Sequence, residues 1–411
     1  MSKSNVAIVS TVLPRWISDF NALSHRLAES GCQVEIYTPE PSSNYKDGWR
    51  SVKTVERSKT MLHPKVRSRH LPYSTYKLRI VQLLKCVVQG LKLASVKNRL
   101  TILWTILPIL LFGPPLKLFG RSVIYQITGL GSVFSVSASA SRRRWLTEFV
   151  YSFLFRGENF RILVHNHEDK AFLCERFSIE EYKIHVTGGC GVDPKEFPYQ
   201  SEYQGNPIPV IYAPTRLSVE KGVFDVCQAS GLLDKRGFKH ELWFTSEIDP
   251  NDFSSLSQEQ VDQLKIDYPS VRFLGYQKSV VETLKRCDMV CIATWYREGL
   301  PTAILEAASS GRPIVTTDNV GGREFIEDGV NGKLVDPRRP DQLADSIMNL
   351  AENSDQAEQM REAAYERFLG GYTKDHMVSI AIQACAEIWP YLPDTKRAPV
   401  SATQATSQAV R

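Results

Sequence analysis

The chain has 411 residues, of which 43% are hydrophobic and 23% charged. It is too long for one ordinary core and has the composition of a soluble globular protein, so we expect two domains. The net charge of +5 is unevenly spread: residues 57–147 contain 16 Lys and Arg without one Asp or Glu, which leaves −11 elsewhere. Such a block favours a polyanionic partner over an ordinary solvated basic face.

The first forty residues predict a strand, a helix and a second strand. NVAIVST is an apolar run too short for a signal peptide and is expected to be the first strand. The amphipathic stretch SDFNALSHRLAESG ends at Gly31, a natural helix stop, and QVEIYTP follows as a strand. This βαβ opening predicts a parallel sheet covered by helices. A polar, basic loop is expected over 41–72.

Two stretches of the acid-free block bear on a membrane. Residues 76–97 place apolar side chains at helical spacing with Lys and Arg between them, which fits a helix lying on an anionic bilayer or, equally well, a helix packed on a sheet. Residues 101–119 are more apolar, but they fall short of the roughly 20 residues of a spanning helix and are interrupted by prolines. The basic residues are not interleaved with aromatic ones, so we expect no nucleic-acid partner.

The remaining elements predict an α/β protein with two doubly wound, Rossmann-like domains that face each other across a cleft. Strands are expected at SVIYQITG and FRILVHN, followed by the helix HEDKAFLCERFS, and a second α/β series begins near residue 208. Ligands of such sheets bind beyond the carboxyl ends of the strands. The expected divisions are an acceptor-binding, membrane-facing domain, a nucleotide-sugar-binding domain, a helix that returns to the first domain, and a disordered tail: 1–198, 199–375, 376–393 and 394–411. The eight cysteines show no framework spacing, so free thiols are expected rather than disulfides or a metal site.

The stretch REGLPTAILEA, which begins at Arg297, is the strongest candidate for a ligand site. Pro301 suits the first position of a helix, and Leu300 before it has no side-chain group that caps one. The amides of Thr302 and Ala303 are then available to an external anion, for which a diphosphate is the natural choice.

Two carboxylates flank this stretch. Glu298 sits in the turn before the helix, where it can accept hydrogen bonds from sugar hydroxyls. Glu306 lies two turns later among apolar residues and is expected to be buried, so it needs a partner to offset desolvation. A ribose diol and a structural arginine are equally suitable partners.

Two further segments of the second series favour a phosphate ligand. YAPTRLSVEKG places Arg216 and Lys221 after a predicted strand. Each alone would indicate a surface salt bridge, but the two together at this location favour binding of a diphosphate. Gly321 and Gly322, in a Gly-rich turn, permit close backbone approach to a ligand before a helix begins.

At this point the residues resemble a known family. REGLPTAILEAASSGRPIVTTDNVGGREFIEDGVNGKLV resembles the donor-binding domain of retaining GT-B glycosyltransferases of family four, with Glu298 and Glu306 as the E-x7-E pair. RLSVEKG matches that family's phosphate-binding Arg and Lys, and GVDPKEF at 191–197 matches its interdomain signature. The resemblance implies a nucleoside-diphosphate sugar donor, no metal and retention of anomeric configuration. It places Glu298 on the donor sugar with Gly299 and Leu300 in the same binding loop, and Glu306 on the ribose.

A second resemblance concerns the first domain. YQITGLGSVF followed by VHNHEDKAFL is similar to the subgroup that adds sugars to lipid-diphosphate-linked intermediates of bacterial surface polysaccharides. Gly129 and Gly131 would let the backbone approach the ligand. Asn166 and Asp169 match the subgroup's N-x-x-D, or else form a structural loop. The histidines at 165 and 167 are candidate general bases, though single histidines are more often structural.

The chain also departs from the family pattern. The loop TVLPRWISDF after the first strand has no glycine, and HELWFTSE lacks the G-x-G that often follows it. Tyr276 lines the base pocket or is a structural aromatic. We therefore predict a glycosyltransferase, peripheral to the cytoplasmic face of a bacterial membrane, that moves a hexose or N-acetylhexosamine to a polyprenyl-diphosphate-linked glycan. The alternatives are a nucleotide-sugar epimerase of the same fold and a non-catalytic binding member of an assembly complex.

Overall fold

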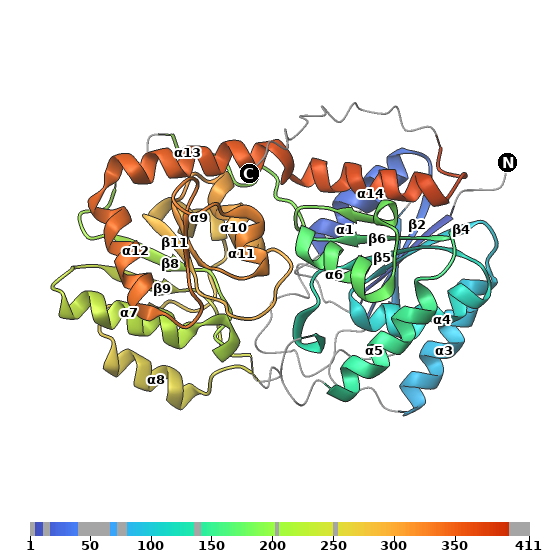
Figure 1. Ribbon diagram of the computed structural model, residues 1–411, viewed down its shortest axis with the longest axis horizontal. Helices are drawn as coiled ribbons and strands as arrows, with labels where there is room; N and C mark the ends of the chain where they lie inside the picture. Colours follow the sequence, from blue (N-terminus) through green and yellow to red (C-terminus); the bar gives the residue numbers. More distant parts are fainter. Residues whose placement is uncertain are drawn as a thin grey trace. The chain divides into compact units, whose positions relative to one another are not determined.

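The computed structural model describes residues 5–10, 17–39, 66–71, 80–134, 141–201, 205–249 and 254–393. Two sheets with helices on their faces make up this part of the chain (Figure 1). Its contacts divide it into two compact units. The first unit holds the described residues up to Gln126, those of 153–163 and those from Asp375 onwards, and the second holds the described residues of 127–152 and 164–374.

The first sheet has seven strands in the order β3-β2-β1-β4-β5-β6-β7. The strands are β1 (Asn5–Ser10), β2 (Gln33–Pro39), β3 (Val66–Leu71), β4 (Arg99–Trp104), β5 (Ser122–Ile127), β6 (Phe160–Val164) and β7 (Ile184–Val186). Neighbours from β3 to β5 pair in parallel, and the strand order reverses between β1 and β4. With α1 (Ile17–Glu29) between β1 and β2, the predicted βαβ opening of a doubly wound sheet is confirmed.

Strand β3 corrects the prediction of a loop over 41–72. Its sequence VRSRHL carries three basic residues and has no apolar run, so it does not resemble a buried strand. It lies at the edge of the sheet beside β2, where charged side chains are well tolerated. The rest of the predicted loop, 41–65 and 72, lies outside the described residues.

Helices cover both faces of the strands in the first unit. On one face, α1 and α14 (Lys374–Ile388) pack against strand residues in a common core. On the other, α3 (Ile80–Ser95) packs on α4 (Ile106–Leu118), and Leu154 at the end of α5 (Ser141–Leu154) fits against Gly113 of α4. The apolar stretch 101–119 is thus shared between β4 and α4. Within the described parts of the chain, no helix is long and apolar enough to cross a bilayer.

The second sheet repeats the same winding in the order β10-β9-β8-β11-β12-β13, and all its pairs are parallel. Its strands are β8 (Val210–Ala213), β9 (Glu241–Phe244), β10 (Val271–Phe273), β11 (Met289–Ile292), β12 (Ile314–Thr317) and β13 (Lys333–Val335). Alternate residues of β8 and β11 enter two separate cores on opposite faces. Burial on both faces explains why these strands are almost uniformly apolar.

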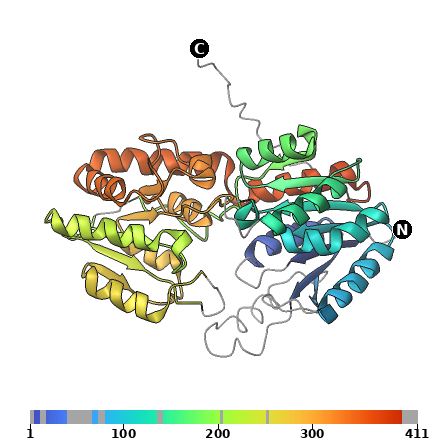
Figure 2. The same ribbon diagram turned by 60° about the horizontal axis from the view of Figure 1, so that its bottom comes forward.

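Two groups of helices supply those cores. One face is covered by α7 (Val223–Lys235), α8 (Gln258–Asp267) and α12 (Pro340–Glu352). The other is covered by α9 (Val280–Arg286), α10 (Thr302–Ser309), α11 (Val320–Phe325) and α13 (Ser354–Gly371). Figures 1 and 2 show α7 and α8, in yellow-green and yellow, as neighbours in this unit.

The predicted interdomain signature forms a short bridge. Val192 pairs with Thr373, and the amide of Lys374 donates to the carbonyl of Val192 over 2.9 Å. Gly191 adopts φ 70°, and a Cβ there would lie 2.7 Å from the Cα of Lys374. The boundaries predicted at 198 and 375 stay predictions, and the predicted tail 394–411 lies outside the described residues.

Candidate functional site

The site lies where two loops leave neighbouring strands of the second sheet. Residues 214–222 follow β8 and 293–301 follow β11, and these two strands flank the point where the strand order reverses. The indole N–H of Trp295 donates to the carbonyl of Val219 over 3.1 Å. Gly222 adopts φ 72°, and a Cβ there would lie 2.1 Å from the carbonyl oxygen of Ala293. The two loops are therefore fastened together at the position where doubly wound sheets bind their ligands.

A cation and an anion, one from each loop, meet at this position. Lys221, at the end of the short 3-10 helix Val219–Lys221, forms an ion pair with the carboxylate of Glu298. Both side chains are mostly buried. Arg216 lies on the same loop as Lys221 and is exposed. The structure thus brings together two of the three predicted catalytic residues and leaves the third at the surface nearby.

The helix that follows Glu298 begins one residue later than predicted. Pro301 is the N-cap of α10, with extended backbone angles (φ −61°, ψ 120°), and Thr302 is the first helical residue. Leu300, which precedes Pro301, is buried in the loop before the helix. Among the described residues, the amides of Thr302 and Ala303 have no protein acceptor, so the predicted anion-binding end of the helix is present.

Glu306 is partly buried, so the burial predicted for its carboxylate is incomplete. The apolar residues on either side of it, Leu305 and Ala307, are fully buried. Residues three and four apart lie on one face of a helix. Glu306 therefore shares its face with Thr302 and Ala303, which are also partly exposed. The helix buries its apolar stripe and leaves Glu306 on the partly exposed side that also holds Thr302 and Ala303.

The glycines predicted to approach a ligand, Gly129 and Gly131, lie against the loop 296–299, and their role at a ligand stays a prediction. A Cβ on Gly129 would lie 2.8 Å from the amide nitrogen of Gly299, and one on Gly131 would lie 2.5 Å from the Tyr296 hydroxyl. A Cβ on Gly299 itself would lie 2.1 Å from the carbonyl oxygen of Thr128. These glycines belong to one unit and allow two backbone segments to pack directly against each other.

The Gly-rich turn with Gly321 and Gly322 also contains a glycine close to the backbone of the loop 296–299. A Cβ on Gly321 would lie 2.9 Å from the carbonyl oxygen of Gly299 and 2.8 Å from Cδ of Pro301. The amide of Gly322 donates to the side-chain oxygen of Asn319, the N-cap of α11, over 2.8 Å, and a Cβ on Gly322 would lie 2.3 Å from the carbonyl oxygen of Thr317. Gly321 therefore packs against the loop that carries Glu298, whereas Gly322 fits closely against the end of β12.

Asn166 and Asp169 also form hydrogen bonds with the loop 296–299. Asn166 is the N-cap of α6 (His167–Phe177), and its side-chain amide donates to the carbonyl of Gly299 over 2.8 Å. Asp169 is fully buried and accepts from Arg297 over 2.8 Å. Burial raises the pKa of Asp169, while Arg297 and Asn166 act in the opposite direction. Asp169 and Asn166 thus bind the residues immediately before and after Glu298. These contacts fit the alternative that N-x-x-D forms a structural loop.

Arg297 is the functional residue that sequence reasoning missed. It adjoins Glu298 in the motif, so its position was visible, but its partner Asp169 is far away in the chain. Only the folded structure shows the pair.

The two histidines differ in burial. His165 is buried against Gly299, and burial lowers its pKa to about 4, so the ring is neutral at pH 7. His167 is exposed and lies 2.9 Å from Glu324, whose hydrogen bond raises the pKa of the imidazole. Tyr276 is exposed in the loop after β10, which places it outside the core. The roles predicted for all three in binding or catalysis stay predictions.

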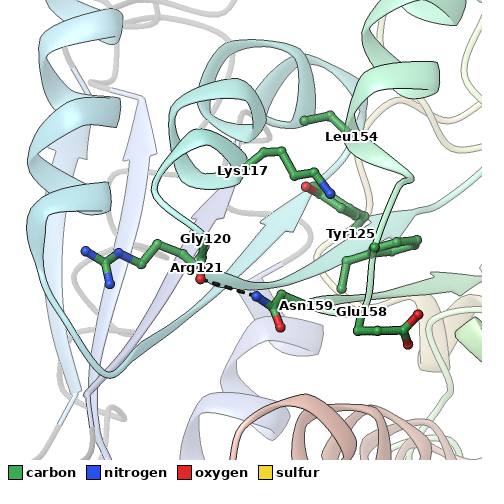
Figure 3. A pocket seen from close by; sticks show the side chains of 9 residues that line it. Lys117, Gly120, Arg121, Tyr125, Leu154, Glu158 and Asn159 are labelled. Atoms are coloured by element: carbon green, nitrogen blue, oxygen red, sulfur yellow. Dashed lines mark hydrogen bonds between the residues drawn. The ribbon is translucent and has the colours of Figure 1, made fainter.

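The first unit contains a small cavity of about 110 Å³, which lies at the wrong end of the strands for a ligand site of this fold. Gly120, Arg121 and Asn159 line it, and they precede β5 and β6 (Figure 3). Ligands of doubly wound sheets bind at the opposite, carboxyl ends of the strands. In the described part of the chain no group of His, Cys, Asp and Glu is suited to a metal ion, and all eight cysteines are free.

Solved structures identify the fold. The chain is similar to sucrose-phosphate synthase from Thermosynechococcus elongatus, with a TM-score of 0.76 and 16% identity over 94% of this chain and all of that one. It is also similar to HepE of Anabaena in complex with UDP-glucose, with a TM-score of 0.69 and 14% identity over 93% and 99% of the two chains. The protein has the GT-B glycosyltransferase fold.

The family signal lies in the second sheet. Residues 208–353 match the family model described as "Glycosyl transferases group 1", so this part of the chain is a group 1 glycosyltransferase domain. The chain is 26% identical over 240 residues to N,N'-diacetylbacillosaminyl-diphospho-undecaprenol alpha-1,3-N-acetylgalactosaminyltransferase of Campylobacter jejuni, which covers 55% of this chain and 60% of that protein. It is 26% identical to the putative glycosyltransferase EpsD of Bacillus subtilis, over 53% of this chain and 57% of that one. The matches thus span less than two thirds of either relative.

Proposed function

We propose that the protein is a retaining glycosyltransferase that moves a hexose or N-acetylhexosamine from a nucleoside-diphosphate sugar to a polyprenyl-diphosphate-linked glycan of a bacterial surface polysaccharide. The observation that carries the proposal is the ion pair of Lys221 and Glu298 beside the free amides of α10. The carboxylate accepts from sugar hydroxyls, and the ammonium and amides receive the diphosphate.

The charges of the site suit departure of a nucleoside diphosphate. Negative charge grows on the diphosphate as the glycosidic bond breaks, and preorganised donors at that point stabilise the transition state. Lys221 and the amides of Thr302 and Ala303 supply fixed donors, and Arg216 adds a charge on the same loop. The departing diphosphate then accepts the acceptor's proton on the same face, which gives retention without an enzymic nucleophile or a metal.

A relative and helix α3 support the lipid-linked acceptor and the membrane location. The Campylobacter jejuni relative is named for an undecaprenol-linked substrate. In this chain α3 buries Cys86 and Leu93 while exposing Lys85 and Lys92, so it both packs on the protein and presents a basic outer side. A polyprenyl-diphosphate in an anionic leaflet of the cytoplasmic face would suit such a side.

The decisive experiment measures sugar transfer in Glu298→Gln. After nucleotide sugars are screened by thermal shift, turnover is measured with the donor that binds and a lipid-linked acceptor. We expect a loss of about 10²–10³ in kcat with an unchanged melting temperature, as for removal of one preorganised group. Glu282→Gln is the matched control, because Glu282 pairs with Lys285 over 2.8 Å on the exposed side of α9.

Other outcomes would contradict the proposal. Full activity in Glu298→Gln would leave a non-catalytic binding role, and conversion of the nucleotide sugar without added lipid would identify an epimerase. The anomeric configuration of the product, followed by NMR, tests retention. Activity that disappears with a chelator and returns with a divalent cation would contradict metal independence.

A further inference from the structure

Helix α5 presents large apolar side chains to solvent instead of to the core. Trp145 and Phe149 are 68% and 64% exposed, and Leu146 and Phe153 are exposed beside them. Their spacing of one, four and eight residues places them on one side of the helix. The rings of Trp145 and Phe149 stack with centroids 5.9 Å apart.

The opposite side of α5 already fixes the helix to the protein. Thr147, Tyr151 and Leu154 are buried, and the Tyr151 ring packs edge-on against Phe177 with centroids 5.8 Å apart. The exposed aromatic side is therefore not needed to hold the helix in place. A contiguous exposed apolar surface of this kind marks an interaction site.

The sequence that leads into this surface is basic. The helix begins SRRRW, and the chain has no Asp or Glu from 57 to 147. Glu148, the one acid of α5, lies 3.0 Å from Arg144 and 2.8 Å from Arg176 and is only 16% exposed. Hydrogen bonds and charges of these arginines lower its pKa against the effect of burial. The carboxylate is thus ionised and neutralised within the protein.

We propose that the aromatic side of α5 docks on an anionic lipid bilayer. Tryptophan and phenylalanine insert at the boundary between headgroups and acyl chains, and a basic segment favours anionic headgroups. A second copy of this chain offers no acid on α5 to meet the arginines, because Glu148 is already paired. The inference rests on the proposed function in its choice of a membrane-linked acceptor, and it adds the surface that meets the membrane.

Vesicle flotation of the full chain tests this surface. Trp145→Ser with Phe149→Ser is compared with wild type on phosphatidylcholine vesicles with and without phosphatidylglycerol, at low and high salt. We expect wild type to float with the anionic vesicles in a salt-sensitive manner and the double variant to bind at least about tenfold less. Ile266→Ser with Leu369→Ser is the matched control, because these apolar residues on α8 and α13 are also well exposed, at 75% and 48%, and it should float like wild type.

Three results would overturn the inference. These are flotation of the Trp145/Phe149 variant at the wild-type level, equal binding of wild type to neutral vesicles, and a wild-type oligomer that the variant splits in light scattering. Thermal shift with the nucleotide sugar, without vesicles, should be the same in wild type and variant. Lost flotation with donor binding intact supports the surface even if the proposed transfer fails, and transfer with unchanged flotation contradicts the surface alone.

Discussion

The loops that follow the strands of the first sheet and those that follow the strands of the second differ in burial. Asn166, Asp169 and His165, after β6, are almost completely buried and contact protein groups. Lys221 and Glu298, after β8 and β11, keep part of their surface open and pair with each other. Both sheets have the same winding, so topology does not set this difference.

The comparison separates residues that position the site from residues that act in it. A buried group with protein partners stabilises one conformation of the loop 296–299, whereas a partly open charge can exchange its protein partner for a ligand. Substitutions after β6 should therefore change stability first, and substitutions after β8 and β11 should change turnover first. Function belongs to the loops and not to the shared fold.

The largest expected effect is that of Gly299→Ala, which tests whether the loop 296–299 must pack directly against Thr128 and His165. The new methyl group would lie 2.1 Å from the carbonyl oxygen of Thr128 and 2.9 Å from the His165 ring, and the backbone cannot withdraw cheaply. We expect the free energy of unfolding in urea to fall by about 3 kcal/mol. Gly370→Ala in α13, with nothing within 4 Å, should raise it by about 0.5–1 kcal/mol. Equal stability of the two variants would contradict direct packing.

A second prediction concerns pH and His165. The folded pKa of about 4 lies below the ordinary value of about 6.5, so between these values the unfolded chain binds a proton that the folded chain does not. The free energy of unfolding should therefore fall as pH decreases through this window, by at most about 3 kcal/mol. Urea unfolding from pH 7 to 4 measures it. His165→Gln should remove this part of the pH dependence, while His185→Gln, on β7, should keep it; identical profiles would exclude His165 as the source.

The smallest expected effect is that of Asp169→Asn, which weakens the interaction with Arg297 and leaves the shape of the side chain nearly unchanged. We expect a loss of about 2 kcal/mol in stability, because a buried charged hydrogen bond is replaced by a neutral one. If Asp169 positions Glu298, KM for the donor should rise by a larger factor than kcat falls. Asp318→Asn, which removes the exposed pair with Arg323 at 2.7 Å, should change stability by less than about 0.5 kcal/mol and leave KM unchanged. An unchanged KM in Asp169→Asn would restrict that residue to a structural role.

Much of the fold was predictable because it depends on short-range patterns. Apolar runs and helix stops located the β1–α1–β2 opening and the buried strand β11. The polar edge strand β3 was missed because its sequence lacks the apolar run that identifies a buried strand. The predicted start of α10 was wrong by one residue, because proline suits both the N-cap and the first helical position and the sequence does not distinguish them.

The candidate site was predictable in its chemistry but not in its support. The spacing of Glu298 and Glu306 and the cations after β8 are visible in the sequence. The contacts of Asn166 with Gly299 and of Asp169 with Arg297 join residues more than a hundred positions apart, and no local pattern records such pairs. The outward aromatic side of α5 was also missed, because apolar residues in a helix normally indicate the core.

The loop 296–299 has atoms packed against its backbone from Thr128, Gly129 and Gly321. Such a stretch cannot lengthen, shorten or bulge to follow a differently shaped sugar. Under the proposed function, we expect donor preference to depend on the side chains at the border of this loop, and engineering a new preference should begin with substitutions there and avoid insertions.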